Sequence, residues 1–189
     1  MPEAVTSLDG ATYSGFVTIK DAGLAGMIQL RADLGDADVV LALKGAGIEL
    51  PDTGDLVGGL GNGALWMSPD ELMILRAHDE AEATAATLAE ALGGLHALVA
   101  NVSDSRAVFR LSGEGPAVRE VLAKLSPADL RQTALPPGRV RRTRLAQVPA
   151  AFWFAGDDEA VLVCFRSVAG YVLDLLSNVA TPGSEVGHF

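Results

Sequence analysis

Arginines gathered on one predicted strand are the residues of this sequence best suited to do chemistry. Five of them fall within fourteen residues that contain no acidic side chain: Arg131, Arg139, Arg141, Arg142 and Arg144. Because side chains alternate along a strand, Arg139 and Arg141 would share one face, and the other two strand arginines the opposite face. Unpaired guanidinium groups buried on both faces would cost several kcal/mol per ion, so at least one face must meet water, a ligand or an acidic partner. The pattern therefore predicts either a docking edge or an anion pocket, since arginine suits both.

Arg166 and Trp66 are the two candidate cofactor-binding side chains of the sequence. Arg166 follows the apolar run 160–165 and precedes Ser167, a residue type that caps helices. Trp66 lies on a predicted strand before Pro69, where its ring could stack on a flat heterocycle or anchor a core or an interface. Both residues are candidate cofactor-binding residues on these grounds.

The remaining residues predict neither a catalytic group nor a metal site. The three histidines lie far apart, and none has metal-ligand spacing around it. Cys164 lies within an apolar strand, where we expect a buried core thiol. Residues 58–63 are rich in glycine, but they lack the Lys-Ser/Thr ending of a phosphate-binding loop and precede a hairpin, which favours a mobile connector.

Composition narrows the class of protein. The chain has 189 residues, 49% of them apolar, which predicts one domain or two small ones. A chain of this length can form a core without a disulfide or a structural metal. A mean hydropathy of +0.30 excludes a disordered chain. The longest apolar runs are far shorter than the roughly 20 residues that cross a bilayer. A single cysteine and a start without a secretory signal favour a cytoplasmic protein that has no membrane partner.

The net charge of −10 is spread unevenly along the chain. Residues 1–95 carry 15 acidic and 4 basic side chains, whereas residues 96–189 carry 9 and 10. The acidic half would repel phosphate backbones, so we expect no nucleic-acid partner. We expect the arginine-rich half to face a partner protein.

Strand and helix periodicities alternate in an order that nearly repeats. The main local signals are a helix cap at Asp36, a hairpin turn at residues 68–71, a capping box at Asp79, a strand at residues 140–148 and a helix cap at Ser167. They predict an α+β fold of two pseudo-duplicated β-α-β-β-α-β halves, with helices packed on antiparallel sheets. The expected organisation is a flexible N-terminal arm (1–22) with one short strand around residues 15–19, a domain (23–179) made of halves 23–102 and 103–179, and a C-terminal tail (180–189).

Several segments resemble the gamma subunit family of heterotetrameric sarcosine oxidase and the wider aminomethyltransferase family that includes the glycine-cleavage T-protein. Two segments resemble the subunit family: residues 65–74 (LWMSPDELMI) and 163–169 (VCFRSVA). Five further segments resemble the wider family in the same order along the chain: residues 101–104 (NVSD), 111–122 (LSGEGPAVREVL), 126–130 (SPADL), 135–138 (LPPG) and 143–149 (TRLAQVP). The similarity covers most of the chain, residues 24–178.

The resemblance implies a folate-binding-domain-like fold and membership of a four-subunit enzyme. That enzyme oxidatively demethylates sarcosine to glycine, with hydrogen peroxide and, when tetrahydrofolate is present, methylenetetrahydrofolate as products. In the family, the alpha and beta subunits carry FAD, FMN, NAD and folate, and the delta subunit carries zinc, so no cofactor is expected in this chain. Asn101 stands where aminomethyltransferases carry Asp, and the chain lacks their C-terminal barrel, so no catalytic residue is carried over.

The leading hypothesis is a non-catalytic gamma subunit that scaffolds the flavin-bearing subunits in sarcosine catabolism and one-carbon metabolism. The arginine strand and Trp66 would face its partners. An alternative is a stand-alone folate- or anion-binding protein that uses Arg166 and the arginine strand. A third reading, an autonomous aminomethyltransferase, predicts turnover by the chain alone.

Overall fold

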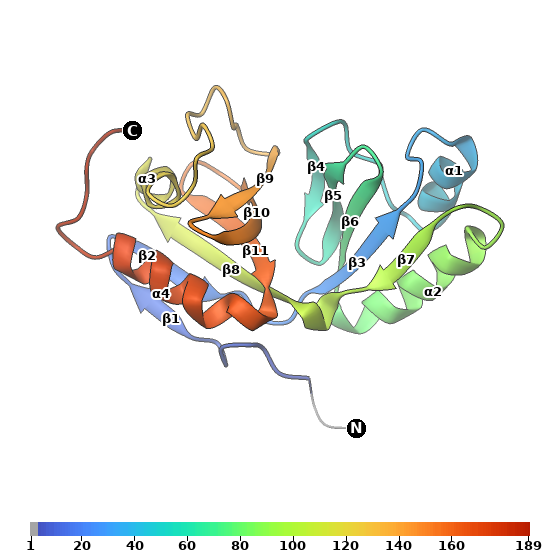
Figure 1. Ribbon diagram of the computed structural model, residues 1–189, viewed down its shortest axis with the longest axis horizontal. Coiled ribbons are helices and arrows are strands. Elements are labelled where there is room, and N and C mark those ends of the chain that lie inside the picture. The colour runs from blue at the N-terminus through green and yellow to red at the C-terminus, as the bar shows by residue number, and fades with distance from the viewer. Residues whose placement is uncertain (1–3) are drawn as a thin grey trace. The chain divides into compact units, whose positions relative to one another are not determined.

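The computed structural model describes residues 4–189, which divide into two compact units (Figure 1). Unit 1 combines the residues up to Leu24 with Asp104–Phe189, and unit 2 is Ala25–Ser103. Within the described residues each unit holds one antiparallel sheet and two α-helices. The expected α+β fold with antiparallel sheets is therefore confirmed.

Unit 2 is built on a sheet with strand order β4-β5-β6-β3-β7. Its strands are β3 (Gly26–Arg31), β4 (Leu56–Gly59), β5 (Asn62–Ser68), β6 (Glu71–Arg76) and β7 (Leu98–Asn101). Its helices are α1 (Ala37–Gly45), the 3-10 turn η1 (His78–Glu80) and α2 (Ala81–Ala91). One face of the sheet packs on both α-helices, because Ile74 shares a buried cluster with Leu43 of α1 and Leu88 of α2.

Unit 1 is built on a sheet with strand order β1-β2-β8-β11-β10-β9. Its strands are β1 (Thr12–Ser14), β2 (Val17–Asp21), β8 (Arg106–Gly113), β9 (Val140–Leu145), β10 (Val148–Phe154) and β11 (Glu159–Phe165). Its helices are α3 (Ala117–Ala123), the 3-10 turn η3 (Arg166–Val168) and α4 (Ala169–Val179). A further 3-10 turn, η2 (Ser103–Ser105), precedes β8. Phe152 packs in one buried cluster with Val121 of α3 and Val172 of α4.

A side chain caps a helix at one of the three positions expected from the sequence. The Asp36 carboxylate accepts the backbone N–H of Asp38 at 2.8 Å and begins α1, as expected. The caps expected at Asp79 and Ser167 are wrong, since each residue lies within a 3-10 turn, and α2 and α4 begin without a side-chain cap. The preceding 3-10 turn instead supplies carbonyl acceptors to the first N–H groups of the helix, as where Ala169 N–H donates to Arg166 O.

The flexible arm expected over residues 1–22 is wrong for most of its length, because it contains β1 and β2. β2 pairs with β8 in antiparallel register, with Ile19 opposite Leu111. Val17 and Ile19 are fully buried in the core of unit 1. The expected half 103–179 is thus completed by an N-terminal hairpin. The short strand expected around residues 15–19 overlaps β2, but its pairing partner lies about ninety residues away in sequence, so local periodicity does not reveal the pairing. Residues 1–3 lie outside the described residues.

Two further segments differ from expectation because of turns. The strand expected over residues 140–148 is two strands, β9 and β10, joined by a tight turn in which Ala146 has φ +51°. The backbone N–H of Ala146 donates to Leu125 O at 2.8 Å, which helps to hold this left-handed conformation. The glycine-rich connector is a hairpin of β4 and β5. Gly58 has φ +73°, and a Cβ there would lie 2.2 Å from Asn62 O, so only glycine fits.

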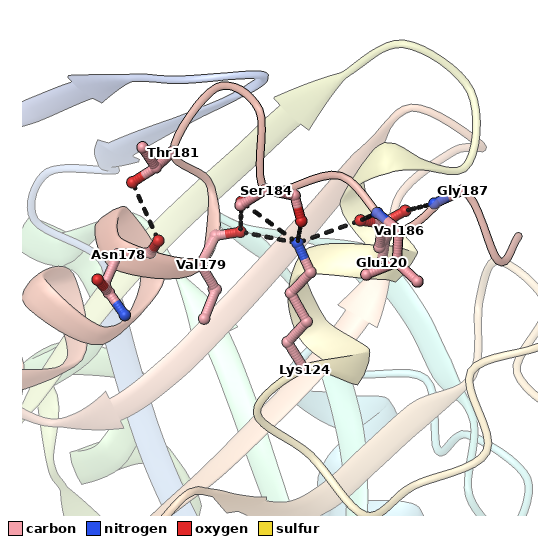
Figure 2. A network of polar contacts seen from close by, with 8 residues as sticks. All are labelled: Glu120, Lys124, Asn178, Val179, Thr181, Ser184, Val186 and Gly187. Atoms are coloured by element: carbon pink, nitrogen blue, oxygen red, sulfur yellow. Dashed lines mark hydrogen bonds and ion pairs between the residues drawn. The ribbon is translucent and has the colours of Figure 1, made fainter.

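The C-terminal tail expected over residues 180–189 is tied to α3 (Figure 2). The Glu120 carboxylate accepts the backbone N–H groups of Val186 and Gly187 at 2.6 and 2.8 Å. Lys124 Nζ donates to the carbonyl oxygens of Val179 and Ser184 at 3.1 and 2.6 Å, and lies 3.1 Å from Glu120 Oε1. The tail is therefore held by two oppositely charged side chains one helical turn apart.

The charge state of Glu120 depends on this network. Burial acts to raise the pKa of Glu120, but the two backbone N–H groups and the Lys124 ammonium outweigh it, so the pKa lies below its ordinary value. A carboxyl whose pKa is lowered on folding stabilises the fold above its unfolded pKa, and this stabilisation is lost as pH falls through the folded pKa.

Glu120→Gln is expected to lower the free energy of unfolding at neutral pH by about 2 kcal/mol, the scale of hydrogen bonds to charged groups. The loss should shrink at acidic pH, where Glu120 is itself protonated. Denaturant unfolding across pH measures the stability, and hydrogen exchange measures protection at Val186 and Gly187. Glu114→Gln, which changes an exposed carboxylate just before α3, is the matched control. Unchanged protection at both amides in Glu120→Gln would contradict this account of the tail.

Candidate functional site

The arginine strand lies at one edge of the unit 1 sheet. Among the described residues, β9 pairs only with β10. Arg141 lies opposite Phe152, whereas Arg142 and Arg144 lie opposite Ala151 and Pro149. Because directly paired residues share a face, Arg141 lies on the side of the helices, and Arg142 and Arg144 lie on the other side. The alternation expected from the sequence is confirmed.

The arginines of this edge have different environments. Arg139, Arg142 and Arg144 are exposed, and Arg141 is half-buried, with its Nε lacking a hydrogen-bond partner in the described chain. Arg139 and Arg142 each have an interaction partner within the chain. Arg144 makes no hydrogen bond or ion pair with the part of the chain that the structure describes.

Arg131 differs from the other arginines because it forms its own salt bridge. Its guanidinium binds the Asp129 carboxylate through Nε at 3.0 Å and through Nη2 at 2.5 Å. The side-chain and backbone hydrogen bonds from Arg131, with a smaller contribution from the charge of Arg141, lower the pKa of Asp129 to about 2. Four arginines therefore remain as candidates for a charged docking edge.

Sequence reasoning missed Arg119, which positions the segment before β9. Arg119 is buried, donates through Nη1 to Leu130 O and Leu135 O at 2.8 and 3.0 Å, and lies 3.9 Å above the ring of Phe154. Burial lowers the pKa of Arg119, while the charge of Asp157 opposes that shift. No local pattern marks such a residue, because its partners are backbone carbonyls of a loop.

Arg166 lines an open recess of about 570 Å³ within unit 1. Its Nη2 donates to Val5 O at 2.9 Å, so part of the guanidinium is already occupied. The other residues that line the recess are Ser7, Asp104, Ser105, Phe165 and Ser167. Asp104 places a negative charge beside Arg166, so the recess is not a purely cationic anion site.

Trp66 lies on β5 of unit 2, half-buried against that unit's core and opposite Leu72. Its backbone N–H donates to Asp55 O at 3.0 Å. The ring thus packs as a core side chain, one of the alternatives left open by the sequence. Trp66 and Arg166 belong to different units.

Unit 2 also holds a polar cluster that the sequence did not indicate. Glu71, buried at the start of β6, accepts from Gln29 Nε2 at 2.9 Å and lies 3.5 Å from Arg31 Nη1. Arg31 also binds Asp70, which with a hydrogen bond from Ser68 lowers the pKa of Asp70. These contacts join β3 to the β5–β6 turn, beside a recess of about 460 Å³. The charged residues of this cluster therefore bind one another and hold the two segments together.

Cys164 and any groups that could ligate a metal are the other possible chemical centres of this chain. Cys164 is buried on β11, and burial raises the pKa of its thiol to about 11, only partly offset by the charge of Arg106. Among residues 4–189, no group of three or more His, Cys, Asp or Glu side chains could hold a metal ion. The same residues contain no helix that is both long and apolar enough to cross a bilayer.

Cys164 is expected to resist thiol reagents in the folded chain. A pKa raised from about 9 to about 11 lowers the thiolate fraction about 100-fold at mildly alkaline pH, and burial also restricts access. Labelling with a chromogenic disulfide should be slow in the native chain and rapid after denaturation. Rapid labelling of the native chain would contradict the buried placement.

One solved structure shares the fold of this chain. The glycine cleavage system aminomethyltransferase T of Bartonella henselae superposes with a TM-score of 0.53 over 80% of this chain and 43% of that chain, at 16% identity. This match supports the aminomethyltransferase-like fold expected from the sequence.

The chain belongs to the sarcosine oxidase gamma subunit family, whose family model matches residues 31–181. It is 34% identical to the sarcosine oxidase subunit gamma of an Arthrobacter species, over 89% of this chain and 84% of the relative. The relative from Corynebacterium sp. strain U-96 is also 34% identical, over 75% and 68%. A chain of the heterotetrameric sarcosine oxidase from Corynebacterium sp. U-96, solved with pyrrole 2-carboxylate, superposes with a TM-score of 0.79 at 27% identity, over 89% and 87%. The resemblance drawn from the motifs is confirmed.

Proposed function

We propose that this chain is the gamma subunit of a heterotetrameric sarcosine oxidase and acts as a non-catalytic scaffold for the other subunits. The observation that carries the proposal is the family match over residues 31–181, together with the TM-score of 0.79 to a chain of the Corynebacterium complex. The complex would oxidise the N-methyl group of sarcosine while reducing O2 to hydrogen peroxide. The methylene carbon would pass to tetrahydrofolate, releasing glycine.

The proposal assigns the chemistry to the partners. The alpha and beta subunits would hold FAD, FMN, NAD and tetrahydrofolate, the delta subunit would hold zinc, and the complex would work in the cytoplasm. Two features of this chain support a scaffold without an active site. The Cys164 thiol is buried, with its pKa raised to about 11. The carboxylates whose pKa is shifted, Asp70, Glu120 and Asp129, each bind structural partners.

The docking surface in this proposal is the β9 edge. Arg142 and Arg144 share one face of an edge strand in a chain of net charge −10, so this segment differs in sign from the molecule as a whole. Charge of this kind steers a partner of opposite charge and fixes its register.

Arg144→Glu is expected to weaken assembly at least about tenfold, or about 1.4 kcal/mol, because it turns attraction into repulsion at the edge. Co-expression with alpha, beta and delta subunits, followed by affinity purification and a dissociation constant, measures the effect. Lys20→Glu makes the same charge change at an exposed position on β2 and should leave assembly unaltered. Failure of the wild-type chain to co-purify would overturn the proposed function. Equal effects of the two variants would remove β9 as the docking edge.

A stand-alone folate or anion binder is favoured by one observation, the position of Arg166 on the wall of the 570 Å³ recess. The scaffold proposal predicts that titrating the isolated chain with tetrahydrofolate, followed by fluorescence or calorimetry, gives no saturable binding below millimolar concentration. Arg166→Ala should then change nothing. Salt-sensitive binding that is lost in Arg166→Ala would support the alternative instead.

A further inference from the structure

We infer that β9 accepts an extended acidic segment of a partner subunit as an additional antiparallel strand of the unit 1 sheet. The inference rests on the proposed function and deepens it, because it states how the β9 edge would bind and what chemistry the bound segment has. Addition of a strand to an exposed sheet edge is an established mode of peptide recognition, in which backbone hydrogen bonds supply affinity.

The register shows which backbone groups of β9 face outward. Along a strand in an antiparallel sheet, successive residues direct their N–H and C=O groups to alternate neighbours. Ala155 N–H donates to Glu159 O, on the β11 side, whereas Phe154 O accepts from Gly138 N–H, on the β9 side. The even-numbered residues of β10 therefore direct their backbone groups toward β9. The β9 residues opposite them must direct theirs toward β10: Arg141, Thr143 and Leu145.

It follows that Val140, Arg142 and Arg144 direct their backbone N–H and C=O groups away from β10, toward the open edge. Pro149 agrees with this assignment, because it lies opposite Arg144, where the hairpin needs no N–H from β10. No other described strand pairs with β9. Val140 is itself buried, so the exposed residues Arg142 and Arg144 offer the backbone sites for an incoming strand at this edge.

The two edges of the unit 1 sheet differ in what they could accept. β1, at the opposite edge, has three residues, whereas β9 has six. Very short edge strands are one way in which proteins prevent edge pairing. β9 is long enough to bind a segment and is held at both ends, by the Arg119 contacts to the preceding loop and by the tight turn into β10.

Charge identifies the chemistry of the segment. A residue paired directly opposite Arg144 on an added strand would lie on the same face as the Arg144 guanidinium. That guanidinium is exposed and has no ion pair among the described residues. No acidic residue occurs between Arg131 and Arg144 in the sequence. An Asp or Glu opposite Arg144 is therefore the complementary residue, and Arg142, which already has a partner within the chain, adds positive charge on the same face.

The assembled four-subunit complex and two variants at one position test the inference. Arg144→Gln removes the charge and keeps the outward N–H, whereas Arg144→Pro removes both. Proline is tolerated at an edge position whose N–H faces solvent, so the β9–β10 hairpin should persist. Thermal unfolding of each isolated variant checks this. Arg144→Gln is expected to weaken assembly about threefold and Arg144→Pro at least about tenfold.

Hydrogen exchange of the wild-type chain provides a measurement that needs no variant. The amides of the exposed residues Arg142 and Arg144 should exchange freely in the isolated chain and become protected in the complex. Those of Arg141, Thr143 and Leu145 should be protected in both. New hydrogen bonds to an added strand should slow exchange at the outward amides strongly, whereas docking through the arginine side chains alone should leave it near the rate in the isolated chain.

The outcomes separate the inference from the function on which it rests. A larger effect of Arg144→Pro than of Arg144→Gln, with new protection at the amides of Arg142 and Arg144, supports strand addition. Equal effects of both variants with no new protection overturn strand addition and leave a charged docking edge. If neither variant weakens assembly and the outward amides still exchange in the complex, then the arginines protect the edge against pairing. That outcome also overturns the inference. A wild-type chain that does not assemble overturns the proposed function and the inference with it.

Discussion

The pairing of β2 with β8 is the contact on which unit 1 depends. β2 comes before unit 2 in the sequence and β8 comes after it, so unit 1 is complete only when two distant parts of the chain meet. Fully burying a Val or Ile side chain contributes roughly 2 kcal/mol, and β2 buries both Val17 and Ile19. Because closing a longer loop adds little further entropy cost, this gain can hold the two parts together.

The same sheet presents β9 as a preorganised edge. The cation of Arg119 fixes the loop before β9 by binding two backbone carbonyls, and the Ala146 turn fixes the strand after it. A strand held at both ends loses little conformational entropy when a partner binds, so more of the interaction energy remains as affinity. The rigid core and the proposed docking role therefore have a common structural basis.

Charged side chains have two different roles in this chain. Most of those with shifted pKa values hold the fold: Glu120 and Lys124 fasten the C-terminal residues, Asp129 neutralises Arg131, and Asp70 binds Arg31. Arg144, on the face of β9 opposite the helices, does not share this role, since it has no ion pair among the described residues. This contrast supports the proposal that β9, rather than a buried polar group, is the docking surface of this chain.

The sequence by itself determined the α+β class, the β5–β6 hairpin, the cap at Asp36 and the alternation of arginines on β9, because each depends on residues close together in the chain. It also carried the motifs that identify the family. Only the tertiary structure decided that β2 pairs with β8, that Arg119 supports the loop before β9, and that Glu120 and Lys124 hold the last residues. Those contacts join side chains to backbone groups or strands far away in sequence. Their stability comes from burial and hydrogen bonds that exist only after folding, so no local period or composition records them.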